Sequence, residues 1–154
     1  MFRSLPRIIA FGFGSGLLRP APGTWGTLLG WLLWVAGLSR LPDAGIAAVL
    51  LAAFVLGCWT CHRVGREIGA SDHGGMVIDE IVAFWLVLWL TPPSLTAQAV
   101  AFLLFRFFDI LKPQPIGFFD RRWKNGFGVM WDDILAAAYS LLLIAILVRL
   151  GVFV

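Results

Sequence analysis

The stretch Ile46–Cys61, IAAVLLAAFVLGCWTC, decides the fold class of this chain. It contains no charged residue and no proline, so it can form a helix that is apolar on every side. Such a helix needs either a large protein core or a lipid bilayer around it. A chain of 154 residues is too small to bury that much apolar surface in water. The stretch therefore predicts a membrane helix.

The composition of the whole chain supports a membrane protein. Hydrophobic residues make up 60% of the sequence and charged residues 14%, whereas a soluble domain is about half apolar and about a quarter charged. The chain also has eight Trp, a residue that collects at membrane interfaces. The basic residues are scattered between apolar stretches, so the net charge of +3 does not indicate nucleic-acid binding. Phospholipid headgroups are the expected partners.

Four more apolar stretches complete the predicted fold, an all-α, polytopic membrane helix bundle that forms one domain over residues 1–154. The five predicted membrane helices are Trp25–Leu38, Ile46–Cys61, Val77–Leu90, Leu95–Leu111 and Ile134–Leu150. A full crossing needs about 20 residues. We therefore expect the first and third helices to be short or interfacial. The oligomeric state does not follow from the sequence.

The distribution of Lys and Arg predicts the orientation, because cytoplasmic loops carry the excess of positive charge. With the N-terminus in the cytoplasm, the inner segments hold Arg3, Arg7, Arg19, Arg63, Arg66, Lys112, Arg121, Arg122 and Lys124. The outer segments then hold only Arg40 and Arg149. The N-terminus is therefore predicted to lie in the cytoplasm and, with five crossings, the C-terminus outside.

This topology gathers acidic residues at the cytoplasmic face. Asp79 and Glu80 open the third predicted helix, Asp109 closes the fourth, and Asp132 and Asp133 open the fifth. Carboxylates beside a bilayer repel one another and are costly to desolvate, so they need a compensating charge. Mg²⁺ prefers such oxygen ligands. We expect the two adjacent acidic pairs to bind Mg²⁺ and all five acids to be catalytic. The alternative is that the acids only stabilise helix N-termini, which explains neither the doubling nor Asp109.

A second charged pattern lies in the fourth predicted helix. Arg106, Asp109 and Lys112 are spaced i, i+3 and i+6, so a helix places them along one side. Arg106 and Lys112 are predicted to be catalytic residues that bind the phosphate oxygens of a substrate. The alternative is a ladder of charges that anchors the helix end at the interface.

Two glycine-rich stretches add candidate phosphate contacts, since glycine lets backbone amides approach an anion. The first, GFGSGLLRPAPGTWGT over residues 12–27, supplies the predicted substrate-binding residues Ser15, Arg19 and Thr24. The second, Gly126-Phe127-Gly128, is expected to lie just before the fifth helix. The alternative is that such runs form glycine turns or allow close helix packing, which are commoner than phosphate cradles.

The chain resembles the bacterial phosphatidylglycerophosphatase A family in four stretches. These are GFGSGLLRPAPGTWGT (12–27), DHGGMVIDE (72–80), FRFFDILKPQPI (105–116) and GFGVMWDD (126–133). The resemblance implies a Mg²⁺-dependent enzyme that hydrolyses phosphatidylglycerophosphate to phosphatidylglycerol and phosphate. It also implies functional roles for Asp79, Glu80, Asp109, Lys112, Asp132 and Asp133.

Other chemistries fit the residues less well. The spacing from Cys58 to Arg63 is too short for a cysteine phosphatase loop, and the two histidines lack the basic partners of histidine phosphatases. Two mechanisms remain open, attack by an activated water or by an aspartate. An ion or solute transporter is an alternative function, but its acids would lie near the membrane midplane. A metal-dependent lipid headgroup transferase is another.

Overall fold

The computed structural model describes residues 5–17, 21–69, 77–111 and 126–152, which form helices and turns without a β-strand. The main helices are α2 (Pro22–Ala36), α3 (Asp43–Ile68), α4 (Ile78–Trp89), α5 (Leu95–Leu111) and α7 (Gly126–Arg149). Shorter elements are α1 (Leu5–Ala10) and the 3₁₀ helices η1 (Gly12–Leu17) and η2 (Leu38–Arg40). The all-α prediction is confirmed for these residues.

Each predicted membrane helix corresponds to one observed helix, and α5 has the predicted bounds. The largest differences concern α3, which spans Asp43–Ile68 rather than Ile46–Cys61, and α7, which begins at Gly126 rather than at Ile134. The prediction that Asp132 and Asp133 open this helix is therefore wrong, because both lie inside it. The expectation that Gly126-Phe127-Gly128 precedes the helix is also wrong. The first turn of a helix leaves its amides without intrahelical partners, and glycine is tolerated there more readily than in the interior.

Local signals in the sequence explain several helix ends. Pro22 lies in the first turn of α2, where its missing N–H is not needed. Gly69 ends α3 in the left-handed conformation, with φ of 73°. Before α5, the Ser94 hydroxyl accepts a hydrogen bond from the Ala97 N–H at 3.2 Å and so caps the helix.

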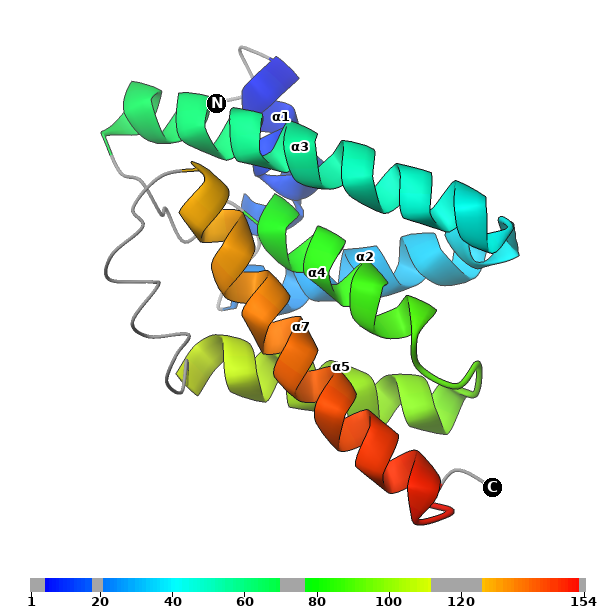
Figure 1. The fold of residues 1–154 in the computed structure, drawn as a ribbon. Helices are drawn as coiled ribbons and strands as arrows, with labels where there is room; N and C mark the ends of the chain where they lie inside the picture. The colour runs from blue at the N-terminus through cyan, green and yellow to red at the C-terminus, as the bar shows by residue number, and fades with distance from the viewer. Residues whose placement is uncertain (1–4, 18–20, 70–76, 112–125, 153–154) are drawn as a thin grey trace.

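Helix α4 lies at the centre of the bundle (Figure 1), in contact with α2, α3, α5 and α7. It is buried on nearly every side, which fits a sequence that is apolar all round. An aromatic group fixes its packing: the Phe84 ring lies 5.7 Å from Phe105 on α5 and 6.4 Å from Trp31 on α2. The Trp85 indole also donates a hydrogen bond to the Gly30 carbonyl at 2.8 Å. These contacts hold α2 and α5 against α4.

The outer helices expose apolar side chains that a soluble protein would bury. Leu32 on α2, Leu51 on α3, Leu103 on α5 and Leu142 on α7 are all exposed. Two of the described helices, Asp43–Ile68 and the Met130–Arg149 part of α7, are long and apolar enough to cross a membrane. A membrane-embedded bundle is the plausible arrangement, because lipid can cover these faces.

Candidate metal and phosphate site

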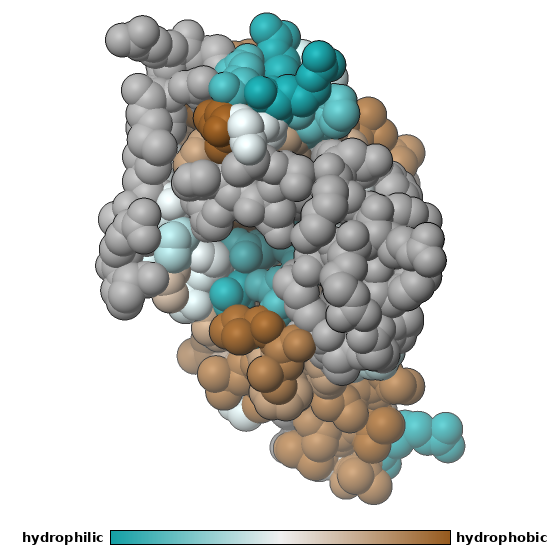
Figure 2. Space-filling model, turned by 90° about the vertical axis from the view of Figure 1, so that its left-hand side faces the viewer, coloured by the Kyte–Doolittle hydropathy of each residue, from teal (hydrophilic) through white to brown (hydrophobic). Residues whose placement is uncertain are grey.

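One end of the bundle collects the predicted acidic residues. Helices α2, α4 and α7 begin at the left of Figure 1, and α3 and α5 end there. Figure 2 views this end and shows hydrophilic residues inside a recess, with hydrophobic residues below them. The predicted convergence of the acids from three helices on one end is therefore observed.

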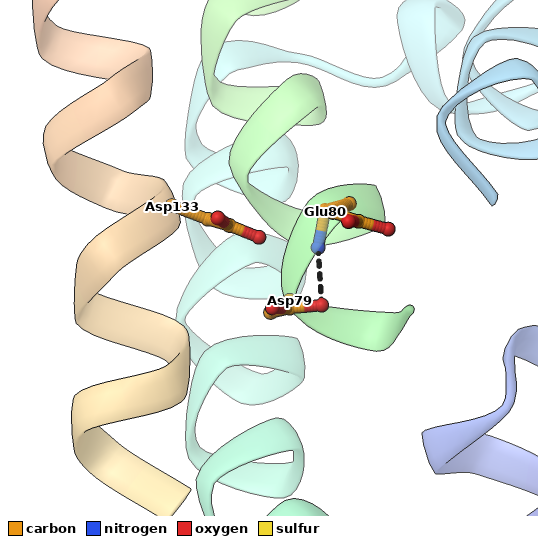
Figure 3. A group of neighbouring side chains, drawn as sticks. All are labelled: Asp79, Glu80 and Asp133. Carbon is orange, nitrogen blue, oxygen red and sulfur yellow. Dashed lines mark hydrogen bonds between the residues drawn. The ribbon is translucent and has the colours of Figure 1, made fainter. Parts of the chain in front are cut away.

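Three of these acids form a compact group (Figure 3). Ligand oxygens of Asp79, Glu80 and Asp133 all lie within 4.8 Å of one another. Asp79 and Glu80 belong to the first turn of α4, and Asp133 reaches them from α7. Asp79 is held in place because its Oδ1 accepts a hydrogen bond from the Glu80 backbone N–H at 2.9 Å. The Glu80 Oε2 and Asp133 Oδ2 atoms are buried and have no hydrogen-bond partner among the described residues.

Arg106 provides positive charge beside this group. Its Nη1 lies 3.3 Å from Glu80 Oε1 and also forms an ion pair with Asp109 Oδ2. The side chains of Arg106 and Glu80 are each only 13% exposed. Arg106 and Asp109 therefore share one side of α5, as predicted, and the structure shows that they are in contact there. The Nε of Arg106 is buried without a hydrogen-bond partner among the described residues, so it remains a possible donor to another group.

The remaining candidates occupy different positions. Asp132 is buried on α7 but lies outside the group of three acids. Asp109 acts on both Glu80 and Asp133 through its charge. The Ser15 hydroxyl donates to the Gly12 carbonyl at 2.8 Å, within η1. Thr24 is half-buried in the first turn of α2. Arg19 and Lys112 lie outside the described residues.

The structure adds Gly23, which the sequence pattern does not distinguish from the other glycines of its run. A Cβ atom on Gly23 would lie 2.5 Å from Glu80 Oε1 and 2.8 Å from Arg106 Nη2. The first turn of α2 therefore packs directly on the ion pair. The PAPGTWGT run indicated a close backbone approach, but it did not show which glycine makes that approach or to what.

The three acids concentrate negative charge in a small volume. Two unit charges 4.8 Å apart repel by about 3 kcal/mol at an effective dielectric constant of about 20. Three ionised carboxylates contain three such pairs, and their total repulsion approaches the stability of a typical folded domain. One guanidinium that is shared with Asp109 does not balance this repulsion. A divalent cation could balance this repulsion. The uncharged hydrogen-bond donors at helix N-termini contribute less.

Comparison with known proteins identifies the family. A profile described as phosphatidylglycerophosphatase A matches residues 8–148. A phosphatidylglycerophosphatase A of Haemophilus influenzae is 48% identical over 139 residues, which cover 89% of this chain and 85% of the relative. The chain belongs to the phosphatidylglycerophosphatase A family.

Two further relatives also match most of the chain. The phosphatidylglycerophosphatase A of Escherichia coli is 37% identical over 86% of this chain and 77% of its own length. A protein of Bacteroides thetaiotaomicron is 38% identical over 92% of both chains and carries the provisional name phosphatidylinositol-3-phosphatase. No solved structure matches the chain significantly. The predicted resemblance is confirmed, and membership in phosphatidylglycerophosphatase A makes the chain a phosphatase enzyme of phospholipid metabolism.

Proposed function

We propose that this enzyme hydrolyses phosphatidylglycerophosphate to phosphatidylglycerol and inorganic phosphate at the cytoplasmic face of a bacterial inner membrane. The observation that carries the proposal is the meeting of Asp79, Glu80 and Asp133, from two helices, within 4.8 Å. Two relatives that cover most of the chain carry the name of this activity. A transporter is the weaker alternative, because the acids gather at one end of the bundle.

The residues present fit Mg²⁺. Their donors are carboxylate oxygens, which this hard cation prefers, and two of these oxygens are buried without hydrogen-bond partners among the described residues. Asp79, Glu80 and Asp133 would hold the ion, whereas Asp132, the preceding residue on α7, lies outside this group. When bound, Mg²⁺ supplies positive charge to phosphoryl oxygens and makes a bound water more acidic.

The protein's own residues would position and neutralise the phosphate. Arg106 Nε is a buried donor beside the acid group, while its Nη1 is held by Glu80 and Asp109. This arrangement presents a fixed guanidinium to a phosphoryl group, whose transition state is stabilised by positioning and positive charge. Lys112 would add a second cation, and Ser15, Arg19 and Thr24 remain candidates for holding the headgroup. Attack by a water is the leading mechanism; trapping a phospho-aspartate would replace it with attack by a carboxylate.

The proposed topology has five membrane helices with the N-terminus in the cytoplasm. Helix α3 has 26 residues and extends about 39 Å. This length is enough to cross the membrane and to place its last turns outside the hydrocarbon core. Helices α2, α4 and α5 have 15, 12 and 17 residues, so they would cross a thinned or interfacial region. A single cysteine at Asn125 should react with an impermeant reagent only after the inner face is opened. Labelling of this cysteine in intact cells would show that the chain has the opposite orientation.

The activity test uses purified protein in mixed micelles. Phosphate release should occur from phosphatidylglycerophosphate with Mg²⁺ and stop with EDTA. Phosphatidylinositol 3-phosphate should be supplied in a parallel reaction, because one relative carries a name based on that headgroup. Faster turnover of phosphatidylinositol 3-phosphate would reject the proposed substrate. Release that is unaffected by EDTA would reject the metal.

A further inference from the structure

Gly23 lies where a helix backbone approaches a buried ion pair. A Cβ on this residue would be 2.5 Å from Glu80 Oε1, 2.8 Å from Arg106 Nη2 and 3.0 Å from Glu80 Cδ. Real Cβ contacts essentially never fall below 3.0 Å. Any side chain on Gly23 must therefore move the carboxylate, the guanidinium or α2 itself.

These groups have little freedom to move independently. Arg106 is paired with both Glu80 and Asp109, and Glu80 shares a close group with Asp79 and Asp133. Both ends of the Arg106–Glu80 pair are mostly buried. A displacement of the Glu80 carboxylate would therefore alter the geometry of all three acids.

We propose that Gly23 is a positioning residue. Its missing side chain lets α2 pack over the Glu80–Arg106 ion pair and fixes the Glu80 carboxylate beside Asp79 and Asp133. Gly23 would contribute no chemical group to the reaction. It acts through Glu80 and Arg106, in the way that residues outside a coordination sphere orient the groups within it. The effect on metal affinity rests on the proposed function; the effect on the ion pair does not.

Two other glycines of α2 provide matched controls. A Cβ on Gly26 would lie 2.6 Å from Val77 Cβ, so Gly26→Ala crowds an apolar contact and not the ion pair. A Cβ on Gly30 would lie 3.4 Å from the Ile81 Cα and Cγ2 atoms, which is ordinary contact. The three substitutions thus make the same chemical change on one helix against three different neighbours.

The first experiment measures thermal unfolding in detergent with EDTA. Each glycine variant is made in two backgrounds, one that retains Glu80 and one that carries Glu80→Asp. Asp withdraws the carboxylate by one methylene, so it should relieve the clash at residue 23. Gly23→Ala should lower the melting temperature with Glu80 and lower it much less in the Glu80→Asp background. Gly26→Ala should lower it equally in both. Equal losses for Gly23→Ala, or failure to fold in both backgrounds, would overturn the proposal.

The second experiment titrates Mn²⁺ as a spectroscopic substitute for Mg²⁺, without substrate. Gly23→Ala should weaken Mn²⁺ binding by about tenfold or more, and Gly30→Ala should bind as the unchanged chain does. Unaltered binding by a folded Gly23→Ala protein would reject the link from Gly23 to the metal site. If the unchanged chain binds no Mn²⁺, the proposed metal site fails, and the unfolding experiment alone decides the role of Gly23.

Discussion

Two Arg–Glu pairs in this molecule have nearly the same length and very different surroundings. Arg63 and Glu67 lie 3.4 Å apart on the last turns of α3, with side chains 55% and 33% exposed. Arg106 and Glu80 lie 3.3 Å apart between α5 and α4, with both side chains 13% exposed. The first pair loses little hydration, so its contribution to stability is small. The second loses most of it and persists because other charges surround it.

The comparison shows that burial, more than distance, separates a structural surface contact from a candidate functional one. The charge of Arg63 is also satisfied by the Trp59 ring, 5.6 Å away on the exposed side of α3. The charge of Arg106 is shared by two acids and attracts Asp133 as well. Keeping such a cluster away from water lowers stability, and a function at this site would explain why that cost is tolerated.

The largest expected effect follows from removing the buried cation. Arg106→Gln leaves Glu80 and Asp109 without the guanidinium that contacts both. We expect a loss of about 3 kcal/mol in the free energy of unfolding, measured with denaturant in detergent without metal. A loss below about 1 kcal/mol would place this pair in the same class as the surface pair.

The next effect concerns the acid group. Asp133→Asn keeps the side-chain volume and removes one charge from a group of three, so turnover should fall by about a hundredfold or more, equivalent to about 2.7 kcal/mol. Asp79→Asn should behave similarly. Asp43→Asn is the matched control, because Asp43 is exposed at the other end of the bundle and its Oδ1 accepts from the Trp89 indole. Near-normal turnover in both site variants would make these acids structural.

Metal removal should have a comparable effect on stability. A ligand present at about a hundred times its dissociation constant stabilises the folded protein by about 2.7 kcal/mol. Saturating Mg²⁺ should therefore raise the melting temperature of the unchanged chain and of Asp43→Asn. It should raise that of Asp133→Asn much less. An equal rise in all three proteins would locate the bound cation elsewhere.

A smaller effect tests the shape of the guanidinium. Arg106→Lys keeps the charge but loses the planar guanidinium, whose Nη1 contacts Glu80 and Asp109 and whose Nε is proposed to contact phosphate. Turnover per folded molecule should fall by about tenfold, or about 1.4 kcal/mol. Lys112→Gln should also lower turnover if Lys112 binds phosphate. If both variants lose only stability, this side of α5 is an anchor.

The smallest effect belongs to the surface pair. Arg63→Ala should change the free energy of unfolding by less than about 1 kcal/mol and leave turnover within about twofold. Raising the salt concentration should reduce even this difference, because exposed charges are screened. A larger loss that salt does not reduce would mean that burial is not what distinguishes the two pairs.

The helices and the chemical types at the site follow from the amino-acid sequence alone. The apolar stretches located all five main helices, since hydrophobic residues without charges leave few alternatives in a short chain. The spacing of Arg106 and Asp109 predicted that they lie on one side of a helix, because residues three apart share a helix face. The prediction that acids from three helices share one end followed from alternating helix direction and the positions of the acids.

Only the tertiary structure decided which of those residues meet. Asp132 and Asp133 are the same residue type, so the sequence does not show which of them joins the acid group. Adjacent residues on a helix point about 100° apart. The packing of α7 on α4 brings Asp133 to Asp79 and Glu80. The sequence also did not predict that α7 begins at Gly126. Glycine disfavours a helix, but the preference is weak and tertiary contacts can outweigh it. The approach of Gly23 to Glu80 and Arg106 depends on how closely two helices pack, a distance set by all their side chains together.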